Sequence, residues 1–575
     1  MDGLLRGVHA ELNLRQLSRR ERLALGTICL CALIIWIALQ YGRTFIGDEV
    51  ATLPLLKQSA AYLLTHFTVH LTMNYFILVE KWVAWLSGGA TDWRLVLLPL
   101  TAAVAIIPLT ASLTLKFTGS TRTALIAASL AAFNPYLVYW GVMIRSYSFL
   151  VALSLWALIE FFQWNWRGGW WSGVRCAAAV LFLLLAHISG VYTVAFIVLL
   201  LALETVSLGW SRGRSFFWQA RTLWIPLAGA ALIVGIAYWH LLPDIEKINR
   251  VWGTDTPPTS LGYLPQVFTT YMTMGVGWGT ALGFTTYMSS GVGYGTYLGA
   301  LLLFVGIWSA LREKRSLLLL CGAIILAPVI MSLQGVSLHP SDSARYLVFS
   351  LPWILILMAE GISWLASHIR IRGGAIAAAW CLTVLVILCW VPSVGAQFVV
   401  KERWPYARVA KFLHTKMQKN DVIVAGWMLR YTLSQFFDDA ESRMLLPDAY
   451  VNKLATNLDA PATGRVFYVT KMDVSNDRKV SIKRFGVLEV TIYSGRTPRV
   501  LLERWRKDLL DRTSGRVIWP FESYYRLLAL LEERLSSPQS ADHWRSLAES
   551  CRLQNPYVQD VPKHLQKAVR AVQFP

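Results

Sequence analysis

The stretch LALGTICLCALIIWIALQY, residues 23–41, is followed at once by GRTFIGDEVATL, residues 42–53. The first piece is apolar over a length close to the roughly 20 residues that a helix needs to cross a bilayer. It ends in Gln-Tyr-Gly-Arg rather than in the small residues of a cleavage site, so we expect it to remain as a membrane anchor. The second piece places two acidic side chains, Asp48 and Glu49, just beyond the end of that anchor.

Similar apolar blocks recur along about two thirds of the chain. The composition, with 55% hydrophobic residues, 26 Trp and only 15% charged residues, is typical of membrane proteins rather than of soluble domains. These features predict a polytopic all-α membrane bundle. We predict eleven transmembrane helices, at residues 23–41, 95–115, 123–140, 146–163, 174–188, 191–208, 223–242, 294–311, 316–334, 346–365 and 375–391.

Lys and Arg are concentrated in every second loop between these spans. The basic positions are Arg15, Arg19, Arg20, Arg22, Lys116, Arg122, Arg167, Arg175, Arg212, Arg214, Arg221, Arg312, Lys314, Arg315, Arg370 and Arg372. Because such residues favour cytoplasmic loops, the pattern predicts a cytoplasmic N-terminus and an extracytoplasmic C-terminus. The same loops account for much of the formal charge of +20. Since no nucleic-acid-binding motif accompanies that charge, we expect no nucleic-acid partner.

Two loops on the predicted outer side are too long to be simple turns. The first, residues 42–94, contains two helix-like pieces at 50–65 and 71–87, which we expect to lie in the membrane interface. The second, residues 243–293, is rich in Gly, Thr, Tyr and Pro. A loop of this length is either a mobile lid or a passive connector, and the sequence leaves both open.

The composition becomes that of an ordinary soluble protein near residue 396. Helix-like WPYARVAKFLHTKM (404–417) precedes three strand-like pieces, DVIVAGW (421–427), RVFYVT (465–470) and FGVLEVTIYSG (485–495), and the remainder is helical and charged. We therefore predict two domains. Residues 1–395 form the transmembrane module, and residues 396–575 form an extracytoplasmic α/β or α+β domain.

Charged and imidazole side chains recur at the predicted outer ends of the spans. Arg145 and Arg345 run against the charge bias of that side, which indicates an anionic partner such as a phosphate. Asp48 and Glu49 are either hydrated acids at the interface or include a general base for a lipid-borne substrate. His187, at the break between two spans, is either a structural group or a ligand-binding one. Together they describe a site for a phosphorylated lipid and a hydroxyl acceptor.

Several motifs occur in an order that resembles the GT-C superfamily of polyprenyl-phosphate-sugar glycosyltransferases. The resemblance is to the bacterial branch related to protein O-mannosyltransferases and to the transferases that modify lipopolysaccharide. It covers roughly the first 350 residues. The matching pieces are GDE (47–49), His70 with MNYFILVEKWVAWLSG (73–88), DWRL (92–95), FNPYLVYWGVMIRSYSFL (133–150), the His187 break, and SARYLVFSLP (343–352).

The resemblance implies transfer of a sugar, with inversion, from a polyprenyl-phosphate donor to an envelope acceptor at the extracytoplasmic face of the membrane. The acceptor would be a glycolipid, a polysaccharide or a protein hydroxyl. Asp48, with Glu49 as its competitor, would be the catalytic base, and Arg145, Arg345 and His70 would stabilise the phosphate.

Further substrate contacts are implied for Tyr147, His187 and Tyr346. Relatives carry His-Pro-Pro or Lys-Pro where this chain has His70-Leu71-Thr72, and some carry a second acidic residue where it has Arg145. No cofactor is required by this reading. A divalent metal held by Asp48 or Glu49 with His70 is an additional option.

Two other classes of function also fit a polytopic bundle with charged groups at one face. One is a transporter or flippase of a lipid-linked sugar, and the other is a non-catalytic subunit of envelope assembly. The sequence shows no detectable internal repeat and few ionisable residues in the middle of its spans, and both observations disfavour a transporter.

Overall fold

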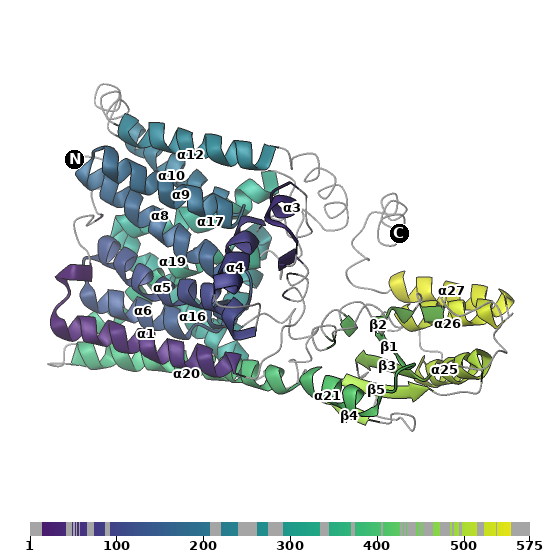
Figure 1. Cartoon of the computed structure of the whole chain (residues 1–575). Helices are drawn as coiled ribbons and strands as arrows, with labels where there is room; N and C mark the ends of the chain where they lie inside the picture. Colours follow the sequence, from purple (N-terminus) through teal and green to yellow (C-terminus); the bar gives the residue numbers. More distant parts are fainter. Residues whose placement is uncertain are drawn as a thin grey trace. The chain divides into compact units, whose positions relative to one another are not determined.

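A computed structural model of the chain divides into two compact units (Figure 1). The first comprises Met1–Tyr41 and Pro54–Phe398, and the second comprises Gly42–Leu53 and Val399–Pro575. The residues that the structure describes are 8, 14–41, 49, 52, 55–56, 58–65, 74–86, 92–207, 220–239, 261–273, 291–333, 344–369, 374–403, 406–425, 429–430, 433, 437, 444–447, 450–451, 464–471, 483–485, 488–493, 497–513, 522–535 and 538–553.

The first unit is a bundle of apolar helices (Figure 1). Its helices are α1 (Arg19–Gln40), α3 (Ala60–Thr65), α4 (Asn74–Leu86), α5 (Asp92–Thr118), α6 (Thr121–Phe133), α7 (Pro135–Gly141), α8 (Tyr147–Arg167), α9 (Trp170–Ala186), α10 (Gly190–Ser207), α12 (Arg221–Trp239), α14 (Leu264–Thr273), α16 (Gly291–Arg312), α17 (Leu318–Leu333), α19 (Leu351–Ser367) and α20 (Gly374–Arg403).

Within the described part of the chain, seven helices are long and apolar enough to cross a membrane, or eight if the bent pair α6 and α7 is one span. The shorter apolar helices α9, α10 and α17 lie at three further predicted spans. The predicted polytopic helical fold is therefore confirmed, and the predicted number of spans is confirmed in part. The protein is an integral membrane protein.

The helices differ in how much of their surface the bundle covers. In the apolar window of α19, 89% of the residues are buried, whereas the figures are 17% for α12 and 22% for both α1 and α20. Figure 1 shows α12 on one side of the bundle, with α1 and α20 on the opposite side. Their exposed side chains include many Leu, Ile and Val residues. These helices therefore form the lipid-facing surface, and α19 forms the centre.

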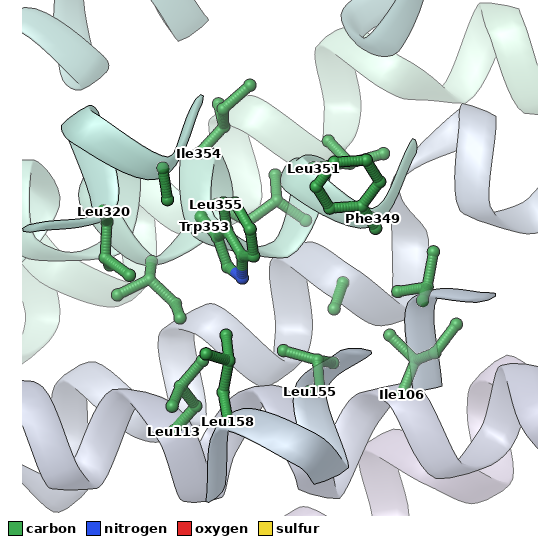
Figure 2. Packing of buried hydrophobic residues seen from close by; sticks show 14 of the residues in the cluster. Ile106, Leu113, Leu155, Leu158, Leu320, Phe349, Leu351, Trp353, Ile354 and Leu355 are labelled. Atoms are coloured by element: carbon green, nitrogen blue, oxygen red, sulfur yellow. The ribbon is translucent and has the colours of Figure 1, made fainter. Parts of the chain in front are cut away.

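Apolar side chains from three other helices meet those of α19. Figure 2 shows Trp353 and its neighbours in α19 converging with side chains of α5, α8 and α17, such as Leu113, Leu158 and Leu320. The labelled residues are at most 4% exposed. Because lipid is as apolar as these side chains, close packing rather than exclusion of water must hold the helices together here.

Two glycines allow α16 and α19 to approach at the backbone. A Cβ atom on Gly306 would collide with the carbonyl oxygen of Leu357, and one on Gly361 would collide with that of Leu302. The clashing atoms belong to main chain within a helix, so they have no freedom to move aside. Small residues at helix crossings serve this purpose in membrane bundles.

The second unit contains a five-stranded sheet with the order β2-β1-β3-β5-β4. Strands β2 and β3 pair with β1 in parallel, while β5 pairs antiparallel with both β3 and β4. Helices accompany the sheet, as predicted for an α/β or α+β domain. The elements are α21 (Tyr406–Lys416), β1 (Val422–Ala425), β2 (Met444–Leu445), β3 (Val466–Lys471), β4 (Lys483–Phe485), β5 (Leu488–Tyr493), α25 (Pro498–Thr513), α26 (Glu522–Arg534) and α27 (Pro538–Leu553).

A partly buried ion pair fixes the start of the parallel strands. The carboxylate of Asp421 accepts hydrogen bonds from the backbone N–H groups of Gln418 (2.7 Å) and Arg465 (2.8 Å). It also accepts one from the guanidinium of Arg465 at 2.7 Å. Burial alone would raise the pKa of Asp421, but the hydrogen bonds from Arg465 and the backbone outweigh it and hold that pKa below its usual value. The carboxylate thus holds β1 and β3 in register.

The glycine contact between α16 and α19 gives the first testable prediction. Replacing Gly361 with Val should force the two helices apart and destabilise the bundle by more than about 2 kcal/mol, because the added methyl groups meet main chain rather than a flexible side chain. The loss should be measured as a lower thermal midpoint and a lower yield of monodisperse protein in detergent. Gly322→Val is the control, since nothing lies within 4 Å of a Cβ at Gly322. Equal stability of the two variants would contradict the packing argument.

Candidate active site

A helix break at Asn134 shapes the first part of the candidate site. Pro135 follows Asn134, and the residue before a proline disfavours helical geometry, so α6 ends at Phe133. The Oδ1 atom of Asn134 accepts hydrogen bonds from the N–H groups of Tyr136 (3.0 Å) and Leu137 (3.1 Å) and thereby caps α7. The two helices meet at an angle of 59°.

The short helix α7 leads directly to the turn that carries Arg145. Arg145 is only 5% exposed, and its backbone N–H donates to the carbonyl oxygen of Met143 at 2.7 Å. Ser146 follows at the N-cap of α8, but its hydroxyl makes no capping hydrogen bond. No hydrogen-bond partner for Ser146 Oγ exists among the residues that the structure describes, although the atom is buried. The turn therefore carries a buried guanidinium and, in the next residue, a buried hydroxyl.

A second helix break, between α9 and α10, holds His187. Its backbone is extended, with φ −160° and ψ 130°, and the side chain is fully buried. The Nδ1 atom accepts a 3.1 Å hydrogen bond from the N–H group of Ser189. The neutral ring consequently carries its proton on Nε2. Within the described part of the chain, the buried Nε2 atom has no hydrogen-bond partner, so His187 offers one N–H donor.

The third contribution comes from the turn before α19. Arg345 lies with its guanidinium carbon 5.1 Å from the centre of the Tyr346 ring, a cation–π distance. The rings of Tyr147, His187 and Tyr346 contact one another with centroid separations of 5.3 Å (Tyr147 to His187), 5.9 Å (His187 to Tyr346) and 6.3 Å (Tyr147 to Tyr346). We refer to Arg145, Tyr147, His187, Arg345 and Tyr346 as the arginine–aromatic cluster.

The electrostatics of this cluster favour an anion. Both guanidinium groups lie close enough to His187 to act on it electrostatically. The N-termini of α8, α10 and α19 follow Arg145, His187 and Arg345 within a few residues, and each adds a partial positive charge. Two positive charges, a neutral N–H donor and three helix N-termini thus share one region, and each of these groups favours a phosphate.

The predicted site residues divide into two groups. Sequence reasoning selected all five members of the arginine–aromatic cluster, and the structure brings them together. Asp48 and His70 lie outside the described residues. Glu49 has helical backbone, is fully buried and belongs to the second compact unit. The assignment of Asp48 and Glu49 as catalytic residues stays a prediction.

Other residues of the region gave no clear signal in the sequence. Trp140 packs on Tyr147 with ring centres 4.3 Å apart, and Tyr136 packs on Trp140 at 5.9 Å. The hydroxyl of Tyr136 is within electrostatic range of Arg345. Aromatic residues in an apolar helix are usually core residues, so only their place in the FNPYLVYWGVMIRSYSFL motif could have marked them.

Glu80 is a further residue that sequence reasoning did not select. It lies on the buried face of α4 with Phe76, Ile77 and Ala84, and it is 0% exposed. Neither carboxyl oxygen has a hydrogen-bond partner among the described residues. Burial raises the pKa of Glu80 well above its usual value, because an apolar environment disfavours the charged carboxylate.

The described residues contain no group of three or more His, Cys, Asp or Glu side chains placed to hold a metal ion. The metal ligands suggested by the sequence were Asp48 or Glu49 together with His70. Of these, Asp48 and His70 lie outside the described part of the chain.

Comparison with solved structures identifies the fold. The chain is similar to crystal structures of ArnT from Cupriavidus metallidurans. The form bound to undecaprenyl phosphate matches with a TM-score of 0.51 and 14% identity over 81% of this chain and 97% of that chain. The apo form matches with a TM-score of 0.51 and 13% identity, over 82% of this chain and 98% of that chain. No protein-family model matches the sequence, and no curated protein matches it. The GT-C fold predicted from the motifs is confirmed.

A weaker likeness links the chain to the Saccharomyces cerevisiae protein O-mannosyltransferase Pmt1-Pmt2 complex bound to the sugar donor. The TM-score is 0.33 and the identity 15%, over 39% of this chain and 34% of that chain.

The cluster predicts that each arginine contributes to anion binding. Arg345→Ala and Arg145→Ala should each weaken the binding of a polyprenyl phosphate by about 10- to 100-fold, the effect of losing hydrogen bonds to a charged group. Lys at either position should restore only part of the affinity, because an ammonium group cannot form the two-pronged contact of a guanidinium. Binding should be measured by ligand titration of the purified protein in detergent or nanodiscs.

Arg312→Ala is the matched control for this pair. Arg312 is exposed near the C-terminal end of α16, where its guanidinium lies 4.4 Å from the ring centre of Trp308. Its replacement should leave the affinity unchanged. Unaltered affinity in both cluster variants would place the anion site elsewhere.

Proposed function

We propose that this protein is a membrane glycosyltransferase that transfers a sugar from a polyprenyl-phosphate carrier to an envelope acceptor with inversion. The acceptor is a glycolipid, a polysaccharide or a protein hydroxyl. The observation that carries the proposal is the convergence of Arg145, Arg345 and the Nε2–H group of His187 on one region. It lies in a fold shared with ArnT, which was crystallised with undecaprenyl phosphate.

The proposed reaction begins at the acceptor. A carboxylate, assigned to Asp48 by its position in the GDE motif, takes the proton of the acceptor hydroxyl. The oxygen attacks the anomeric carbon of the donor sugar from the face opposite the phosphate. The bond between that carbon and the phosphate oxygen breaks, and its electron pair leaves with the phosphate. One bond forms and one breaks, and the configuration inverts because the attack comes from the face opposite the leaving phosphate.

The cluster acts on the leaving group. The donor is a phosphodiester with one negative charge, and the released polyprenyl phosphate carries up to two. A site that holds Arg145 and Arg345 rigidly stabilises the charge that develops during bond cleavage more than the charge of the bound donor. His187 adds a neutral donor, whereas Tyr147 and Tyr346 provide aromatic surface for the sugar or the lipid.

The orientation of the protein belongs to the same proposal. The alternation of basic loops supports a site at the extracytoplasmic face, in the same compartment as the second compact unit. Polyprenyl-linked sugars presented on that side would reach the cluster from the bilayer. A bacterial inner membrane is the setting that the resemblance implies.

Asp48 gives the most direct test of the chemistry. Asp48→Asn should preserve membrane insertion and donor binding, but it should reduce transfer by about 10²- to 10⁴-fold because an amide cannot accept the proton. The measurement is single-turnover transfer from a labelled polyprenyl-phosphate sugar, with donor binding scored on the same preparation.

Glu49→Gln is the paired variant. Adjacent residues of a helix point in different directions, so Glu49 should not share the role of Asp48, and its replacement should reduce transfer less. Full activity of Asp48→Asn would exclude the mechanism. Loss in Glu49→Gln alone would move the base by one residue.

The orientation can be tested by cysteine labelling. Thr415→Cys in the second unit should react with a membrane-impermeant maleimide in intact cells, whereas Ser367→Cys, at the end of α19, should react only after permeabilisation. Both positions are exposed, and both substitutions nearly preserve side-chain size. The scan requires a background in which the seven native cysteines are replaced. The reverse labelling pattern would overturn the proposed topology.

A further inference from the structure

One helix of the long outer loop reaches the arginine–aromatic cluster. Tyr271, near the C-terminal end of α14, is 0% exposed. Its hydroxyl donates a 3.2 Å hydrogen bond to the carbonyl oxygen of Ala344. Ala344 directly precedes Arg345 in the chain. The loop helix is therefore attached to the backbone that carries one of the two arginines.

The main chain of Tyr271 makes a second link. Its carbonyl oxygen accepts a 3.1 Å hydrogen bond from Nδ2 of Asn134. The other side-chain atom of Asn134 caps α7, as described above. Since α7 has only seven residues and runs into the turn at Arg145, the second link attaches α14 to the segment that carries the other arginine.

The ring of Tyr271 completes this connection. It packs against Tyr136, with ring centres 5.2 Å apart. Tyr136 in turn contacts Trp140, which packs on Tyr147. The two arginine segments are about 200 residues apart in the sequence, and Tyr271 contacts both through its hydroxyl, its carbonyl and its ring.

We propose that Tyr271 is a positioning residue for the cluster. It holds the Arg345 segment at a fixed separation from the Arg145 segment. Two guanidinium groups that bind one phosphate must keep their spacing, and a displacement of about 1 Å can cost on the order of 100-fold in rate. The identity of the anion rests on the proposed function. The link between the two segments rests only on the contacts of Tyr271. On this view residues 243–293 include a part that orders the site, rather than only a passive connector.

Tyr271→Phe tests the proposal, because it removes the hydroxyl and keeps the ring. Deuterium uptake should rise in peptides that cover residues 344–350, where the backbone loses its tether. The affinity for polyprenyl phosphate should fall by about tenfold, the effect of one lost hydrogen bond on the geometry of the site. The thermal midpoint should stay close to that of the native protein.

Tyr238→Phe is the matched control. The Tyr238 hydroxyl donates a 3.4 Å hydrogen bond to the carbonyl oxygen of Leu184, between α12 and α9. This variant loses the same chemical group, and it should change neither the uptake in residues 344–350 nor the affinity for polyprenyl phosphate.

The outcomes separate the positioning role from the proposed function. Unchanged uptake in Tyr271→Phe would overturn the positioning role, whatever the protein binds. An equal loss of affinity in Tyr271→Phe and Tyr238→Phe would also overturn it, because the effect would then be one of general stability. Raised uptake in Tyr271→Phe, together with a native protein that binds no polyprenyl phosphate, would support the link and refute the proposed function.

Discussion

A bilayer supplies no water to backbone N–H and C=O groups, so a helix inside it can be interrupted only where other protein groups replace the missing hydrogen bonds. The bundle meets this constraint at two breaks. At Asn134 a side-chain amide caps α7 and binds the carbonyl of Tyr271, and at His187 the imidazole accepts the N–H of Ser189. The breaks position Arg145 and His187. The candidate site therefore depends on the side chains that supply hydrogen bonds to the backbone at these breaks.

Much of the fold could be predicted, because the length of an apolar block and the sign of the loop charges are direct consequences of the bilayer. The predicted span at 123–140 was wrong in one respect, because the chain bends at Asn134 and does not form one straight helix. Hydropathy measures how apolar a segment is, and it does not reveal a change in the direction of the helix axis. The strands β1, β3 and β5 were predicted from their β-branched residues. The short strands β2 and β4 were missed, because two or three residues are too few to show the alternation of apolar and polar side chains that indicates a strand.

The candidate site was predicted from residues whose type is unusual for their position in the sequence. Arg145 and Arg345 stood out because cations are uncommon on the predicted outer side, and His187 because it interrupts an apolar run. Tyr271 and Ser146 are not unusual in their sequence environment, because tyrosine is common in loops and serine is common before helices. Their significance lies in contacts between segments far apart in the chain, which one sequence without an alignment does not reveal.

The arrangement of helix ends strengthens the positive electrostatic field of the two arginines in the cluster. Alternate spans of an antiparallel bundle begin on the same side, so α8, α10 and α19 all direct their N-termini toward one region. Their dipoles add to the field of Arg145 and Arg345 instead of opposing it, so the helix ends and the arginines favour a negative charge at the same place. A bound phosphate would lower the energy of every one of these groups at once. Under the proposed function, this field would favour an anionic lipid over a neutral one, and helix breaks such as the one at Asn134 would hold the charged groups in place.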